Sequence, residues 1–145
     1  MSIRPIALAS AAAVAVSALA PGFDVQAASE KYINVHGDPA IILALIPTHL
    51  PDGKPIDQVF LLNRSKRTYC FKFEIYDDAF IYVPKRVTVM TAPPNSGYQV
   101  TKVKIIASGG KYRFKYAGVY APEGMTDCRK ADFSREVGGE VELEG

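Results

Sequence analysis

The sequence has few of the residues and motifs that catalysis and metal binding usually require. It contains no tryptophan, two cysteines and two histidines among 145 residues. No serine lies in a G-x-S-x-G context, and no glycine-rich phosphate loop is present. The adjacent acids Asp77 and Asp78 follow a strand-like segment, where a turn is more typical than a paired-carboxylate site. We therefore predict a non-catalytic protein that uses no cofactor.

Long hydrophobic runs are also missing, except for one at the N terminus. Arg4 precedes an uncharged, alanine-rich segment from Ile6 to Ala20, and Val25-Gln26-Ala27 ends in the small residues that signal peptidases read. The segment is shorter than the roughly 20 apolar residues that a spanning helix needs. We predict a signal peptide over 1–27 and a single mature domain over 28–145. The mature protein is then periplasmic or secreted, and it does not span a membrane.

Strong net charge is absent as well. The formal net charge is +2 at pH 7, which is too small to favour a nucleic-acid partner, and export makes such a partner less plausible still.

The residues that are abundant favour β-strands. The chain has eight tyrosines and seven phenylalanines, and apolar and polar residues alternate along most of it. Turn-forming residues separate the alternating segments. The expected strands are Lys31–Val35, Ala40–Ile46, Gln58–Asn63, Thr68–Tyr76, Phe80–Met90, Tyr98–Ser108, Lys111–Tyr120 and Glu140–Glu144. Seven to eight short strands predict an all-β, antiparallel β-sandwich of immunoglobulin-like type, with a small β-barrel as the alternative.

The two cysteines, Cys70 and Cys128, predict one disulfide in an exported chain. The alternative, a reactive or metal-binding pair, has no CxxC spacing to support it. Within Thr68–Tyr76 the residues Tyr69, Phe71, Phe73 and Ile75 occupy the inward phase, so Cys70 faces outward. Immunoglobulin domains instead carry an inward bridge beside a buried tryptophan. We therefore expect the disulfide to hold the segment around Cys128 against the outer surface of a sheet.

Gly109-Gly110 suits a two-residue hairpin turn. Such a turn pairs the flanking segments so that apolar and aromatic residues share one face. The pairs predicted from this turn are Ala107/Tyr112, Ile105/Phe114 and Val103/Tyr116.

The other face of that hairpin would be basic. Its members, with one outward residue of a second strand, are Lys102, Lys104, Lys111, Arg113, Lys115 and Lys72. This face could bind an anionic envelope carbohydrate, a lipid headgroup or an acidic protein surface. Alternatively, the acidic stripe of Glu140, Glu142 and Glu144 on the last strand neutralises it.

The remaining candidate is a loop metal site. His36 with Asp38, and His49 with Asp52, would form one if their loops met at the same end of the sandwich. The alternative is that all four are solvated loop residues, and no metal is assigned.

Pro84 interrupts a strand-like run, which indicates an edge strand or a bulge. Edge strands can accept a strand from another protein. The sequence therefore predicts a binding or structural module, an accessory subunit of a cell-envelope assembly whose partner is another envelope protein. A binder of anionic carbohydrate or lipid and a metal-binding protein are the alternatives.

Overall fold

The computed structural model describes residues 29–76 and 79–143, so the predicted signal peptide and Glu144 lie outside the described residues. Strands dominate this part of the chain. They are β1 (Lys31–Asn34), β2 (Ile41–His49), β3 (Pro55–Asn63), β4 (Tyr69–Tyr76), β5 (Ile81–Tyr82), β6 (Val87–Ala92), β7 (Ser96–Ile105), β8 (Lys111–Tyr120) and β9 (Val137–Glu142). Two short 3₁₀ turns, η2 (Val35–Gly37) and η3 (Cys128–Lys130), complete the elements. No helix long and apolar enough to cross a membrane occurs in the described residues.

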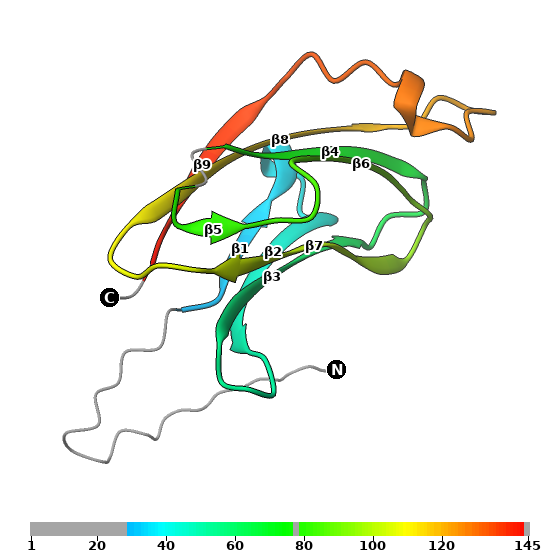
Figure 1. Ribbon diagram of the computed structural model, residues 1–145. Helices are drawn as coiled ribbons and strands as arrows, with labels where there is room; N and C mark the ends of the chain where they lie inside the picture. The colour runs from blue at the N-terminus through cyan, green and yellow to red at the C-terminus, as the bar shows by residue number, and fades with distance from the viewer. Residues whose placement is uncertain (1–28, 77–78, 144–145) are drawn as a thin grey trace.

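The strands form two antiparallel sheets that stack as layers (Figure 1). One sheet has the order β1-β2-β3-β7-β5, and the other has the order β6-β4-β8-β9. Without β1 and β6, these orders are the A-B-E-D and C-F-G sheets of a constant-type immunoglobulin domain. The predicted immunoglobulin-like β-sandwich is therefore confirmed, with β1 and β6 as additional edge strands.

Most predicted strands are present with shifted ends, and Lys111–Tyr120 has the predicted bounds. The predicted strand Phe80–Met90 is in fact two elements. Ile81–Tyr82 pairs with β7 of one sheet, whereas β6 pairs with β4 of the other. Pro84 lies between them, where its missing N–H interrupts no strand pairing.

The predicted Gly109-Gly110 hairpin is wrong. β7 pairs with β3 and β5, whereas β8 pairs with β4 and β9, so the connecting segment crosses from one sheet to the other. The amides of Ile106 and Ala107 anchor this crossing segment by donating to the Phe80 carbonyl. Only Gly109 of the two glycines has a positive φ, so the geometry of a two-residue primed turn is absent.

The main core lies between the two sheets, and each sheet contributes a different kind of side chain. β4 and β8 contribute a stacked aromatic row, whose neighbouring ring centroids lie 5.4–6.3 Å apart: Phe71, Phe73, Phe114 and Tyr116. The five-stranded sheet contributes branched aliphatic side chains, including Ile41, Leu43, Val59, Leu61 and Val103. The predicted inward phase of Thr68–Tyr76 is confirmed, since Tyr69, Phe71, Phe73 and Ile75 are all buried.

The predicted Cys70–Cys128 disulfide is present. Both cysteines are buried, but they belong to a small second cluster that is separate from the main core. Val89 of β6 and Phe133 pack against this cluster. The bridge therefore holds the η3 segment on the outer face of the four-stranded sheet, as the phase of Cys70 predicts.

Candidate functional site

The predicted basic residues do not form one face. Lys102 and Lys104 lie on β7 in the five-stranded sheet, whereas Lys111, Arg113 and Lys115 lie on β8 in the other. The prediction of a single basic face is wrong because it depended on the hairpin.

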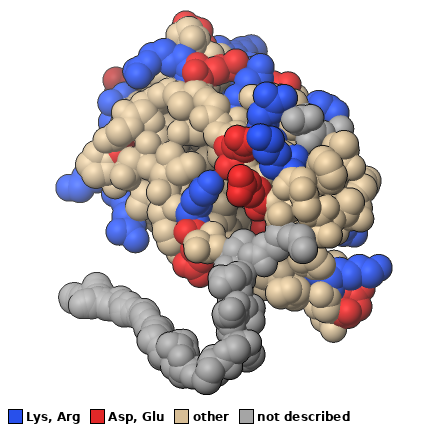
Figure 2. Space-filling view, turned by 90° about the vertical axis from the view of Figure 1, so that its left-hand side faces the viewer, with Lys and Arg blue, Asp and Glu red and all other residues tan. Residues whose placement is uncertain are grey.

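The basic residues of the four-stranded sheet have acidic neighbours. β9 pairs with β8 and aligns Arg113 with Glu140 and Lys111 with Glu142. The Lys111 Nζ atom lies 2.7 Å from the Glu140 Oε2 atom, and the hydrogen bond with Glu140 raises the pKa of Lys111. Figure 2 accordingly shows acidic side chains beside basic ones on the face in view.

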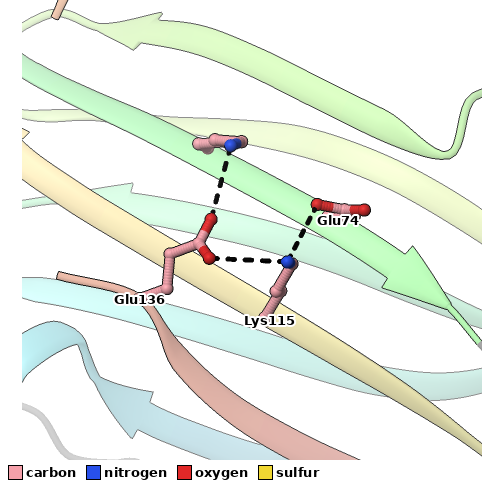
Figure 3. Close-up of polar contacts among 4 residues, drawn as sticks. Glu74, Lys115 and Glu136 are labelled. Atoms are coloured by element: carbon pink, nitrogen blue, oxygen red, sulfur yellow. Dashed lines mark hydrogen bonds and ion pairs between the residues drawn. The ribbon is translucent and has the colours of Figure 1, made fainter. Parts of the chain in front are cut away.

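A second charge network continues across the same sheet (Figure 3). The Lys115 Nζ atom lies 3.5 Å from a Glu74 carboxylate oxygen and 3.4 Å from a Glu136 oxygen. Lys72 donates to the other oxygen of Glu136 at 3.3 Å, and this hydrogen bond is the main cause that lowers the pKa of Glu136. Lys72, Lys111 and Lys115 are therefore paired with acidic side chains, of which only Glu140 belongs to the predicted acidic stripe.

The four metal candidates also separate. His36 and Asp38 precede β2, whereas His49 ends it and Asp52 follows, and a nine-residue strand spans about 30 Å. The two pairs therefore lie at opposite ends of β2, and the condition for the alternative of a loop metal site is not met. Within residues 29–76 and 79–143, no three His, Cys, Asp or Glu side chains are grouped as metal ligands.

His36 and Asp38 instead have local partners. The His36 Nε2 atom accepts from the Gly118 amide at 3.4 Å, and burial lowers the pKa of this imidazole. Asp38 accepts a hydrogen bond from the Tyr120 hydroxyl, which lowers the pKa of its carboxyl.

One edge of the four-stranded sheet has free pairing capacity. β6 pairs only with β4, and its six residues carry no charge. The Ile75 amide donates to the Arg86 carbonyl at 3.0 Å, which fixes the alternation of the antiparallel ladder. From that bond, Val87, Val89 and Thr91 direct their backbone N–H and C=O groups away from β4. No described residue forms a backbone hydrogen bond with these groups.

The other sheet edges are less available. On the opposite side, the Lys31 Nζ atom of β1 donates to the Glu140 carbonyl of β9 at 3.0 Å, so a lysine occupies part of that edge. β5 has only two residues. β6 therefore offers a six-residue, uncharged edge that is not occupied in this way.

The disulfide supports β6 from its outer face. Val89 packs against the Cys70–Cys128 cluster, while Met90 packs against the main core. Contacts on both faces fix the position of the strand and leave its edge exposed. The prediction of an edge near Pro84 identified the correct region, but it placed the edge within one continuous strand.

A pocket opens at the end of the sandwich where β2, β7 and β9 finish and β3 begins. Its volume is about 400 Å³. Both sheets contribute apolar walls, and the principal ones are Leu45, Ile56, Ile105, Val141 and Leu143. Lys31, His49 and Glu142 also line it.

The acidic residue Asp57 also lines this pocket, although it is only 4% exposed. The Tyr112 hydroxyl of the opposite sheet donates to its Oδ2 atom at 2.8 Å. Burial raises the pKa of the Asp57 carboxyl, and the Tyr112 hydrogen bond opposes that rise only in part. Asp57 is not among the predicted site residues, because the predicted strand begins one residue later, at Gln58. The period-two alternation of Val59 and Leu61, extended backwards, places Asp57 on the inner face.

No protein-family model and no curated protein matches the sequence. Among solved structures, the chain is similar to SSP-19, an MSP-domain protein-like family member of Caenorhabditis elegans. The identity is 12% and the TM-score is 0.49, over 69% of this chain and 89% of that chain. It is also similar to WR4, an MSP family member of the same organism, with 10% identity and a TM-score of 0.43 over 69% of this chain and 86% of that chain.

Proposed function

We propose that the protein is an exported, non-catalytic binding module that pairs through the edge of β6 with a strand of another envelope protein. The observation that carries the proposal is the uncharged edge of Val87–Ala92, with the outward backbone groups of Val87, Val89 and Thr91. Natural proteins usually block such an edge with charge, proline or a covering segment. An added strand would satisfy these groups through backbone hydrogen bonds.

The covalent support of β6 is consistent with this role. A disulfide that closes a 58-residue separation stabilises the fold by about 4 kcal/mol in the chain-entropy model. It also holds a segment against the outer face of β6, so the strand is ordered before a partner arrives. A pre-ordered strand reduces the entropy cost of binding.

The test uses two substitutions at Thr91, whose side chain is exposed and whose amide points away from β4. Thr91→Pro removes one outward donor without removing a bond to β4, whereas Thr91→Val keeps the donor and has a similar shape. The tagged protein, processed near Ala28 and purified from the periplasm, is used to capture partners from envelope extract. We expect the parent and Thr91→Val to capture the same partner and Thr91→Pro to lose it, with all three melting as folded proteins.

Site-directed photocrosslinking tests the same edge without the Thr91→Pro substitution. A photoreactive residue at position 91 should crosslink to the captured partner, whereas one at the exposed Tyr32 of β1 should not. Equal crosslinking at both positions, or capture that survives Thr91→Pro, would reject the edge. Binding that falls steeply with salt would instead favour the anionic-ligand alternative, because backbone pairing is only weakly screened.

Export of the protein is tested separately, by measuring its intact mass. Intact mass of the periplasmic protein should show an N terminus near Ala28, after Val25-Gln26-Ala27. Retention of residues 1–27 would change the proposal to a tethered module.

A further inference from the structure

We infer that the pocket at the end of the sandwich binds a small amphipathic amine, with its ammonium group on Asp57 and its apolar part between the two sheets. None of the residues that line the pocket belongs to β6. The inference is therefore independent of the proposed strand pairing.

The carboxylate of Asp57 has few hydrogen-bond partners for a buried acid. Asp57 is almost fully buried, and the Tyr112 hydroxyl is its one hydrogen-bond donor among the described residues. That bond uses the Oδ2 atom, and no described residue donates a hydrogen bond to Oδ1. Buried charged groups in proteins are normally paired with an opposite charge and several donors. A carboxylate held this way lacks a cationic donor.

The lysine that lines the pocket does not supply that donor. Lys31 lines the pocket, but its Nζ atom donates to the backbone carbonyl of Glu140. The lysines of β7, such as Lys104, are exposed on the outer face, and Lys104 lies over the Tyr82 ring. Lys31 and His49 line the same pocket, but no described basic side chain donates a hydrogen bond to Asp57.

The walls define the rest of the ligand. Leu45 and Ile105 come from the five-stranded sheet, and Val141 and Leu143 come from β9 and the residue after it. A pocket of about 400 Å³ is within the range that small-molecule sites occupy. An apolar wall with one buried acid selects an apolar body with one hydrogen-bond-donating cation, and it rejects an anion of the same shape.

The experiment compares three probes of matched shape: 4-phenylbutylamine, 4-phenylbutanol and 4-phenylbutyrate. Binding to the mature protein at pH 7.5 is measured by titration calorimetry, and the site is located by amide chemical-shift changes. We expect the amine to bind at least about tenfold more tightly than the alcohol, the butyrate to bind least, and the shifts to centre on Asp57, Ile105 and Leu143. Asp57→Asn should reduce this preference to about one without weakening the alcohol, whereas the exposed Asp52→Asn should change nothing.

Equal affinities for the amine and the alcohol in the parent protein would overturn the role of Asp57, even if Asp57→Asn failed to fold. Shifts that centre away from the pocket would overturn the site itself. An amine preference that persists in a folded Asp57→Asn variant would assign the selectivity to another group and reject the inference.

Discussion

The inner face of β3 carries a buried polar residue at each end, and the two have very different partners. Asn63 is fully buried, and its side chain takes part in five hydrogen bonds. The Nδ2 atom donates to the carbonyls of Arg67, Ala92 and Pro93, and the Oδ1 atom accepts from the backbone amide and the hydroxyl of Ser65. Asp57 lies at the other end, carries a more costly charge when ionised, and has one donor.

This difference separates a structural polar residue from a candidate binding residue. Asn63 ties together the loops at its end of the sandwich, and every bond it makes is internal to the fold. Asp57 makes a single bond across the sheets and lines an open pocket. Both residues are buried, so burial does not distinguish their roles. The number of hydrogen-bond partners within the fold does distinguish them.

The largest expected effect on stability is at Asn63, whose hydrogen bonds are satisfied within the fold. Asn63→Ala removes five hydrogen bonds at a fully buried position, although the Arg67 and Pro93 carbonyls keep serine hydroxyl donors. We therefore expect a loss of about 3 kcal/mol in the free energy of unfolding. Urea denaturation measures the loss. The exposed Asn34→Ala serves as the control and should stay within about 0.5 kcal/mol of the parent. A loss below about 1 kcal/mol at Asn63 would mean that its network contributes little, and the contrast with Asp57 would fail.

The comparison also requires that β8, which carries Tyr112, belongs to the sheet opposite β3. Gly139 of β9 pairs with Phe114 of β8, and a Cβ atom at Gly139 would lie 2.4 Å from the Phe114 ring. At Gly138 the nearest atom would be 3.7 Å away. We expect Gly139→Ala to lower stability by about 2 kcal/mol through overpacking, and Gly138→Ala to change it far less. Equal thermal melting of the two variants would question the β8–β9 register.

The inward and outward phases of the strands could be predicted from the sequence, but the partners of the strands could not. Val103, Tyr112, Phe114 and Tyr116 are buried, as the false hairpin requires, whereas Ile105 is half-buried and Ala107, beyond the end of β7, is exposed. In a sandwich, two strands on facing sheets present their apolar sides to each other, so local alternation does not distinguish them from two strands of one hairpin. A substitution such as Phe114→Ala would be strongly destabilising in either arrangement and could not have separated them.

The candidate sites show the same limit. The outward phase of Cys70 predicted where the disulfide would lie, because phase is a local property. The grouping of six basic residues required the correct sheet assignment, which depends on long-range pairing. Asp57 was missed for a local reason. It lies near the start of β3, and the ends of strands are the hardest part to predict from sequence.

The bond between Asp57 and Tyr112 provides an intermediate test. Tyr112→Phe removes the one donor and leaves the carboxylate without any described partner, so we expect a loss of about 1–2 kcal/mol at neutral pH. In the Asp57→Asn background the same change should cost less, because a neutral amide is less costly to leave unpaired. A double-mutant cycle measured by urea denaturation gives the coupling between the two side chains. A coupling near zero would show that the bond does not matter to the fold.

The smallest expected effect is a gain, and its sign depends on pH. Burial raises the folded-state pKa of Asp57 above the unfolded value of about 3.9, so the folded protein binds this proton more tightly than the unfolded chain does. The resulting contribution to stability is fully present below pH 3.9 and is lost as pH rises through the folded pKa.

Asp57→Asn removes the ionisable group and keeps an acceptor for Tyr112. We therefore expect the variant to be more stable than the parent at pH 7, by roughly 1 kcal/mol, with the difference shrinking towards pH 3.5. Denaturation of both proteins across that range measures it, with Asp52→Asn as the exposed control. A variant that is less stable than the parent at pH 7 would show that the folded protein stabilises the ionised carboxylate, and Asp57 would then resemble the fully satisfied Asn63.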